Sequence, residues 1–194
     1  MSSVTASMVN ELRQRTGAGL MECKKALVEA GGNFDEATVI LKKRGIAFAE
    51  KKVGRDVSEG VIQAYIHPGA RIGVLLELKC ETDFVAKNEE FLKLARDICM
   101  HIAAMSPKYI SFEEIPEEDV AKEREVAAEQ CKGKPVNAIE KIIEGKLAKW
   151  YGEQCLLKQP FVKNQEQTVE SYIAEWISKI GENIKVARFV RYQI

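Results

Sequence analysis

The chain has 194 residues, of which 46% are apolar, and its 29 lysines and arginines are balanced by 29 aspartates and glutamates. This size is enough for one core domain and a small additional module. Because the charges balance, no general attraction to nucleic acid or to an anionic membrane is expected. No apolar run approaches the roughly 18–20 residues of a membrane span, and the N-terminal "MSSVTASMVNELRQR" lacks the features of a signal peptide. We therefore expect a cytoplasmic protein.

Residues 1–48 predict a module of three short helices. Thr5 is placed to cap the first helix, which should stop at Thr16-Gly17, and Gly31-Gly32-Asn33 should end the second. The third helix is expected to end at Gly45. Apolar residues recur at helical spacing in all three segments: Met8, Val9, Leu12; Leu20, Cys23, Ala26, Leu27; Phe34, Ala37, Ile40, Leu41. The core of such a module is small, so we interpret it as a docking unit, joined by a charged linker at residues 49–59.

Residues 60–194 predict an α+β core that begins with an antiparallel hairpin. The hydrophobic period changes to two, Pro68-Gly69 provides the turn, and one apolar face of the hairpin should lie inside. The alternating apolar residues are Ile62, Ala64 and Ile66, then Ile72, Val74, Leu76, Leu78 and Cys80. A last strand is predicted from the shared parity of Ile184, Val186, Val190, Tyr192 and Ile194. Its pairing with the hairpin would complete a three-stranded antiparallel sheet.

The remaining core segments read as helices. A long helix ending before Ser106-Pro107 carries an apolar stripe of Phe91, Ala95, Ile98 and Ile102, which should cover the hairpin. The segments "EEDVAKEREVAAEQ" and "NAIEKIIEGKLAKWYGEQ", separated by Gly133-Lys134-Pro135, predict a helical hairpin. A further helix is expected over residues 168–180.

Nothing in the sequence indicates a cofactor or a metal site. Five cysteines occur without any Cys-x-x-Cys spacing, as expected for buried thiols in a reducing compartment. With two histidines and no local nucleophile–base motif, the chain is not expected to be an enzyme. An enzyme that uses Cys23 or Cys80 as its nucleophile remains the alternative, although the parity of Cys80 in its strand predicts burial.

The stretch "CETDFVAKNEEF" combines a helix start with an unexplained aromatic residue. Thr82 can cap the helix, and Asp83 in the first turn complements the positive end of the helix dipole. Phe84 lies seven residues before Phe91 and could extend the buried stripe. Asn88 interrupts that stripe, however, so Phe84 could equally project beyond the sheet. Spacing alone leaves both interpretations open.

Several motifs in order resemble the elongation factor Ts family of bacterial translation factors. They are "VNELRQRTGAGLMECKKALVEAGGNFDEA", "GVIQAYI", "CETDFVAKNEEF", "GKPVNAIEKIIEGKLAKWYGE" and "LLKQPFVKN". The resemblance covers nearly the whole chain and is to the short form of the family, with one core unit. It implies an N-terminal ubiquitin-associated-like module, a linker and an α+β core.

The resemblance also implies a function and its residues. The family binds elongation factor Tu in its GDP-bound and nucleotide-free states and promotes GDP release as a guanine nucleotide exchange factor. Its Thr-Asp-Phe-Val motif disturbs the magnesium site of that partner. The matching wedge residues are Thr82, Asp83, Phe84 and Val85. Candidate docking residues on the N-terminal module are Leu12, Arg13, Arg15, Met21 and Lys24.

By analogy with short family members, we expect a homodimer in which a second subunit supplies contacts through its sheet or hairpin. A general adaptor protein is the competing interpretation, under which Phe84 would be dispensable.

Overall fold

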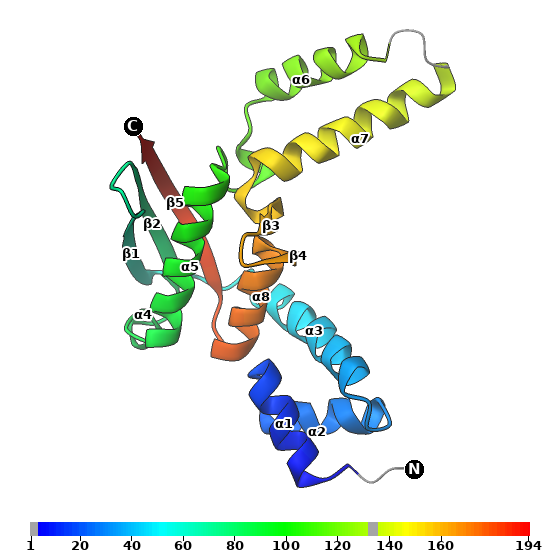
Figure 1. The fold of residues 1–194 in the computed structure, drawn as a ribbon, viewed down its shortest axis with the longest axis vertical. Helices are drawn as coiled ribbons and strands as arrows, with labels where there is room; N and C mark the ends of the chain where they lie inside the picture. The colour runs from blue at the N-terminus through cyan, green and yellow to red at the C-terminus, as the bar shows by residue number, and fades with distance from the viewer. Residues whose placement is uncertain (1–3, 132–135) are drawn as a thin grey trace. The chain divides into compact units, whose positions relative to one another are not determined.

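The computed structural model describes residues 4–131 and 136–194, and it divides into two compact units (Figure 1). The first unit comprises Met1–Val61, Glu77–Leu94 and Ser171–Ala187, and the second comprises Ile62–Leu76, Ala95–Glu170 and Arg188–Ile194. The described residues combine helices with a three-stranded antiparallel sheet, which confirms the predicted α+β class. None of the helices in these ranges is long and apolar enough to cross a membrane.

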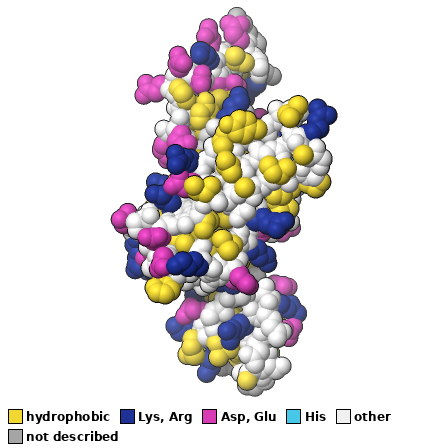
Figure 2. Space-filling model, turned by 90° about the vertical axis from the view of Figure 1, so that its left-hand side faces the viewer, with side chains coloured by type: hydrophobic (Ala, Val, Ile, Leu, Met, Phe, Trp, Pro, Cys, Tyr) yellow, Lys and Arg dark blue, Asp and Glu magenta, His cyan; other side chains and the backbone are white. Residues whose placement is uncertain are grey.

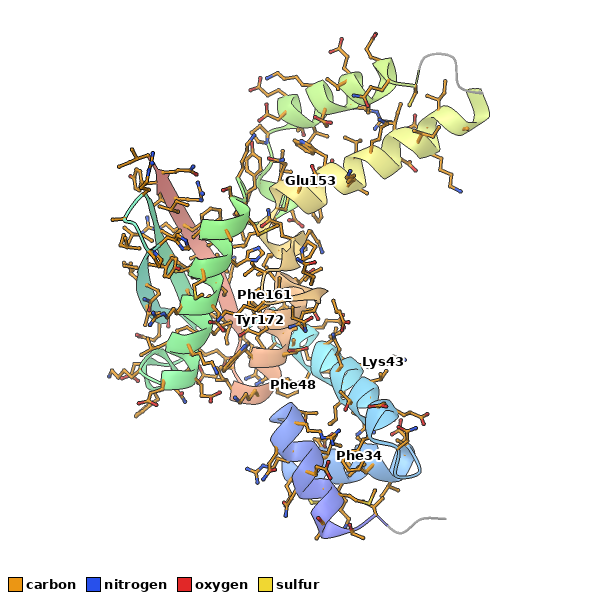
Figure 3. All side chains as sticks on the ribbon, in the orientation of Figure 1. Phe34, Lys43, Phe48, Glu153, Phe161 and Tyr172 are labelled. Atoms are coloured by element: carbon orange, nitrogen blue, oxygen red, sulfur yellow. The ribbon has the colours of Figure 1, made fainter. Side chains whose placement is uncertain are left out.

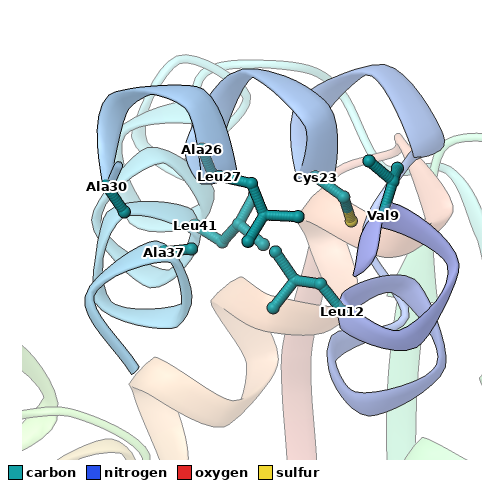
Figure 4. Packing of buried hydrophobic residues seen from close by; sticks show 8 residues of the cluster. All are labelled: Val9, Leu12, Cys23, Ala26, Leu27, Ala30, Ala37 and Leu41. Carbon is teal, nitrogen blue, oxygen red and sulfur yellow. The ribbon is translucent and has the colours of Figure 1, made fainter. Parts of the chain in front are cut away.

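Three helices at the start of the chain form the helical module. They are α1 (Ala6–Thr16), α2 (Leu20–Glu29) and α3 (Phe34–Glu50). The Thr5 hydroxyl accepts a hydrogen bond from the Met8 N–H at the start of α1, and Gly17, with a φ of 70°, ends that helix as predicted. One apolar cluster joins the three helices (Figure 4): Val9, Leu12, Cys23, Ala26, Leu27, Ala30, Ala37 and Leu41.

The end of α3 differs from its prediction. The helix was expected to stop at Gly45, but it continues to Glu50. Gly45 is buried, and a Cβ atom at this position would lie 3.5 Å from the Ser178 side chain. The glycine therefore lies at a packing contact between two helices, where sequence alone suggested a helix end.

The three-stranded sheet has the order β1-β2-β5, so the last strand pairs with the hairpin as predicted. Its strands are β1 (Glu59–Ile66), β2 (Ile72–Cys80) and β5 (Ile184–Gln193). On β2 the predicted alternation holds, because Val74, Leu76, Leu78 and Cys80 are all buried.

The helix α5 (Glu89–Met105) follows the hairpin, and its predicted apolar stripe of Phe91, Ala95, Ile98 and Ile102 is fully buried. In the second unit, the part of α5 from residue 95 onward lies against the sheet (Figure 1). The Cys99 sulfur is 3.6 Å from the Gln63 carbonyl oxygen. From β5, the Arg191 guanidinium donates hydrogen bonds of 3.2 and 3.0 Å to the Ala103 carbonyl.

The exposure of residues at the end of β5 differs from the prediction for this strand. Ile184 and Val186 are buried, but Tyr192 is 68% exposed and Ile194 is 86% exposed. Arg191 faces α5, and successive strand residues alternate between faces, so Tyr192 lies on the opposite side. The expectation that the apolar residues of this strand share one inward face is therefore wrong.

The prediction for β1 is corrected in the same way. Ile62, Ala64 and Ile66 were expected to face inward, but all three are exposed. The large apolar residues on this side of the sheet form the open face: Ile62, Ile66, Leu75, Val190, Tyr192 and Ile194. Figure 2 looks toward this side and shows hydrophobic side chains among polar ones.

The rest of the second unit is mostly helical. Its elements are η1 (Phe112–Glu114), α6 (Glu117–Glu129), α7 (Val136–Gln154), η2 (Leu156–Lys158), the strands β3 (Pro160–Phe161) and β4 (Asn164–Thr168), and the start of α8 (Val169–Ile180). The helices α6 and α7 form the predicted hairpin around Ala127, Cys131, Ile143 and Leu147. The predicted turn at residues 133–135 lies outside the described residues. The ribbon of β3 and β4, in which Pro160 pairs with Thr168, was not predicted.

Behind this ribbon lies a buried polar network on α5. His101 is fully buried, and its Nε2 is 2.9 Å from the Gln159 Oε1. The His101 Nδ1 accepts a hydrogen bond of 3.1 Å from the Val162 N–H. The Gln159 amide donates to the backbone carbonyl of Glu153 at 2.7 Å. The residues Glu153 and Phe161, labelled in Figure 3, lie at the edges of this network.

Candidate functional site

The predicted wedge residues, Thr82–Val85 (below, the wedge), begin a short helix that is separate from α5. The Thr82 hydroxyl accepts a hydrogen bond of 3.4 Å from the Val85 N–H and so caps α4 (Asp83–Ala86), as predicted. The helix ends after one turn, and the Asn88 side chain accepts from the Glu90 N–H at 2.8 Å to start α5. The wedge is therefore a single helical turn between two caps.

Phe84 lies on the outer side of this turn and is 83% exposed. Lys87 and Asn88 separate α4 from α5, so the helical spacing that would align Phe84 with Phe91 does not continue. The interpretation that Phe84 extends the buried stripe is wrong. Burying a phenylalanine side chain is worth about 1.5–3 kcal/mol, and within this chain the Phe84 ring does not gain that energy.

The charged groups beside Phe84 are accessible. The Lys87 ammonium lies 2.8 Å from the Asp83 carboxylate, and this hydrogen bond lowers the pKa of Asp83 and raises the pKa of Lys87. Asp83 is therefore ionised at neutral pH. The wedge presents one exposed aromatic ring beside one carboxylate.

The candidate docking residues on the helical module divide into two groups. Leu12 is fully buried in the core of the module, so it offers no surface to a partner and is withdrawn as a contact residue. Arg13, Arg15, Met21 and Lys24 are exposed, and Met21 is 62% accessible. The Arg15 guanidinium lies over the ring of Phe34, 5.1 Å from its centroid; Phe34 is labelled in Figure 3.

Two features of this surface were missed by sequence reasoning. Leu20 is exposed next to Met21 at the start of α2, and an open depression on α1 is lined by Asn10, Arg13, Gln14 and Gly17. Leu20 was expected to share the apolar stripe of the second helix with Cys23 and Leu27, but it is 45% exposed while those two are buried. The depression is formed by side chains from successive turns of α1, and the spacing of residues in the sequence does not predict how these side chains are oriented.

The arrangement does not favour a cysteine nucleophile. All five cysteines are buried, including Cys23 and Cys80. Burial raises the pKa of Cys80 to about 11 and that of Cys99 to about 12, so neither is an ionised thiolate near neutral pH. Within residues 4–131 and 136–194, no group of three or more His, Cys, Asp or Glu side chains is placed to hold a metal ion.

Comparison with known proteins identifies the family. A family model described as Elongation factor TS matches residues 46–194. Elongation factor Ts of Carboxydothermus hydrogenoformans is 54% identical over 193 residues, covering 98% of this chain and 89% of that protein. The corresponding protein of Thermodesulfovibrio yellowstonii is 55% identical over 193 residues, with coverage of 99% and 96%. That of Fervidobacterium nodosum is 54% identical over 193 residues and is covered to 98% on both sides.

These matches define the chain as a translation elongation factor. More specifically, it belongs to the elongation factor Ts family, as the motifs in its sequence predicted.

Proposed function

We propose that this protein is a guanine nucleotide exchange factor for elongation factor Tu. It binds the GDP form of that GTPase, disturbs the magnesium and phosphate site, and so allows GDP to leave and GTP to enter. The observation that carries the proposal is Phe84, an apolar ring held 83% exposed on a capped turn in a member of this family. The protein itself makes and breaks no covalent bond in this role. The role belongs to translation and therefore to the cytoplasm.

In this proposal one part of the chain binds the GTPase and another part disturbs its nucleotide site. Residues 1–48 dock on the GTPase as a ubiquitin-associated-like module through Arg13, Arg15, Met21 and Lys24. Residues 49–59 link this module to the core, and residues 60–194 carry the wedge. A division of this kind is needed on energetic grounds. Accelerating GDP release by about four orders of magnitude corresponds to about 5.5 kcal/mol, whereas burying Phe84 yields only about 1.5–3.

Linkage makes the mechanism reversible. If this protein weakens GDP binding to the GTPase, nucleotide must weaken the binding of this protein by the same factor. Incoming GTP therefore releases the exchange factor, and the protein needs no nucleotide site of its own.

The test is the release of a fluorescent GDP analogue from elongation factor Tu in the presence of excess unlabelled nucleotide. Wild-type protein should accelerate release, and Phe84→Ala should slow the accelerated rate by about tenfold or more. Phe112→Ala is the matched control, because Phe112 is also exposed (52%) but lies in η1. Its rate should equal that of the wild type. Equal rates for the wild type and Phe84→Ala would reject Phe84 as the wedge, and no acceleration by wild-type protein would favour the adaptor interpretation.

We also propose that the protein forms a homodimer through the open face. Antiparallel sheets commonly cover one face and leave the other polar, but here both faces carry large apolar side chains. A second copy offers the same surface, which a two-fold axis can bring into register with the first.

Sedimentation velocity on the full chain tests the dimer. We expect a mass of two 21.8 kDa chains for the wild type and a shift to monomer for Tyr192→Lys. Val28→Lys is the control, since Val28 is a similarly exposed apolar residue on α2 of the helical module. A wild type that sediments as a monomer at micromolar concentration would reject the dimer.

A further inference from the structure

The base of the wedge is held by a residue that lies one hundred positions away in the chain. Glu182 follows α8 in the loop that leads into β5. Its Oε2 accepts hydrogen bonds from the backbone N–H groups of Glu81 (3.1 Å) and Thr82 (3.0 Å). Its Oε1 accepts from the Thr82 hydroxyl at 2.7 Å. The Thr82 oxygen in turn accepts from the Val85 N–H. One hydroxyl therefore connects the Glu182 carboxylate directly to the cap of the wedge.

The contact is reciprocal, because Glu81 binds the loop that carries Glu182. The Glu81 Oε1 accepts a hydrogen bond of 2.6 Å from the Asn183 N–H, and its Oε2 lies 3.3 Å from the Arg55 guanidinium. Each carboxylate thus accepts hydrogen bonds from the backbone of the segment that carries the other carboxylate. We call Glu81, Thr82, Glu182 and Asn183 the carboxylate junction. Hydrogen bonds from several donors offset the repulsion that two neighbouring carboxylates would otherwise create.

The junction also reaches the end of the helical module. The Asn183 side-chain amide is buried and donates to the carbonyl groups of Val53 (3.3 Å) and Arg55 (2.9 Å), just after α3. Lys52 donates a hydrogen bond of 2.8 Å to the Gly181 carbonyl. These hydrogen bonds join the chain after α3 to the loop beside the wedge.

The last turn of α8 adds contacts on the same side of the first unit. The Lys179 side chain lies against Gly17, where a Cβ atom would be 3.5 Å from the Lys179 Cε, and it pairs with Glu90 at the start of α5. Ser178 lies against Gly45 of α3. Residues 178–183 thus contact α1, α3, the start of α5 and the base of the wedge.

A single helical turn has little stability of its own, since forming the first turn fixes several residues for one hydrogen bond. The direction of Phe84 must therefore be set by contacts outside α4. We propose that Glu182 is a positioning residue: through the carboxylate junction it fixes the orientation of the wedge relative to the helical module. The free energy that the helical module gains on docking can thereby be used to place Phe84 at the magnesium site of the partner. This inference rests on the proposed exchange function.

Glu182→Gln tests the inference, because the amide keeps the shape but replaces one accepting oxygen with a donor. We expect GDP release at saturating protein to slow by about tenfold, equivalent to about 1.4 kcal/mol, while the concentration for half-maximal rate stays unchanged. Glu170→Gln is the matched control, because Glu170 lies at the start of α8, the helix that precedes the Glu182 loop. Its carboxylate pairs with Lys158 at 2.7 Å, and this variant should behave as the wild type.

A double-mutant cycle separates positioning from a general structural role. In the Phe84→Ala background, Glu182→Gln should cause no further slowing, because the side chain that it orients is gone. Equal slowing in both backgrounds would overturn the inference while leaving the exchange function intact. Absence of acceleration by the wild type would instead overturn the proposed function, and the inference with it.

Hydrogen exchange on the free protein distinguishes a local change at the wedge from misfolding of the whole variant. By hydrogen exchange, the amides of Thr82 and Val85 should lose protection in Glu182→Gln, whereas the amides of α2 should keep theirs. Unchanged protection at Thr82 would contradict the proposal. If Glu182→Gln does not fold, Glu182→Asp keeps the charge but shortens the side chain, and it should show the same selective loss to a smaller degree.

Discussion

The helical module and the wedge both expose apolar side chains, but they hold them in place by different means. Behind Met21 lies an apolar cluster contributed by all three helices of the module. Phe84 stands on one helical turn in which only Ala86 is buried, and hydrogen bonds to Thr82 and Glu182 secure its base. When exposed side chains are held by a hydrophobic core, each core substitution should disturb their positions in proportion to the packing that is lost. A surface supported by directed hydrogen bonds should depend on single polar atoms.

The largest expected effect is on the core of the module. Leu12→Ala should lower the free energy of unfolding by about 2–5 kcal/mol, since it removes a fully buried side chain and leaves a cavity. Urea unfolding followed by circular dichroism measures this loss. Met21→Ala should change stability by less than about 0.5 kcal/mol but weaken the complex with elongation factor Tu. A stable Leu12→Ala protein with a weakened complex would restore Leu12 as a contact residue.

The next effect concerns the backbone of β1 where it lies against β2. Gly60, with a φ of 154°, lies so close to β2 that a Cβ atom would be 2.2 Å from the Leu78 carbonyl oxygen. Gly60→Ala should therefore cost at least about 1–3 kcal/mol of stability, because both the conformation and the collision oppose the methyl group. Gly54→Ala serves as the control, as a Cβ atom at residue 54 would have no heavy atom within 4 Å beyond its chain neighbours. Equal denaturation midpoints for the two variants would contradict this account.

The cap of the wedge should give a smaller change. Thr82→Ala removes the hydroxyl that accepts from Val85 and donates to Glu182, and we expect a stability loss of about 0.5–2 kcal/mol with slower GDP release. Thr82→Ser retains the hydroxyl and should stay within a few tenths of a kcal/mol of the wild type. If serine behaves like alanine, the methyl group rather than the hydrogen bonds supports the wedge.

The smallest effect is a pH dependence at a network outside both regions. Burial lowers the pKa of His101 below its usual value of 6.5, so the folded protein binds fewer protons there than the unfolded chain. The free energy of unfolding should therefore fall as the pH drops from 6.5 toward the lowered pKa, and level off below it. Thermal unfolding between about pH 5 and pH 8 measures this slope. His101→Gln should reduce the slope, and an unchanged slope in this variant would contradict the assignment to His101.

Local chemistry predicted a large part of this molecule. The Thr5 and Thr82 caps, the end of α1 at Gly17, the hairpin and the buried stripe of α5 all follow from residues within a few positions of one another. Such features are readable because a cap or a helical stripe depends on neighbours along the chain. The family was equally readable, since several motifs occur in order over nearly the whole length.

The errors occurred where burial depended on distant segments. Leu12 belongs to the apolar pattern of the first helix, but the family resemblance suggested it as a contact residue, and the packing of three helices buries it fully. On β5 the apolar parity was correct as a strand signal, but the position of α5 decided that Tyr192 lies outside. Gly45 was interpreted as a helix end because its contact with Ser178 is not visible from local sequence.

The sequence by itself thus determined the class of fold, the family and the helix start at which Phe84 stands. Only the tertiary structure decided that Phe84 is exposed, which face of the sheet is open, and that Glu182 holds the base of the wedge. The physical reason is the range of the interactions. Caps and periodicity act over one or two helical turns, whereas covering a face or binding Thr82 from Glu182 requires segments one hundred residues apart to meet.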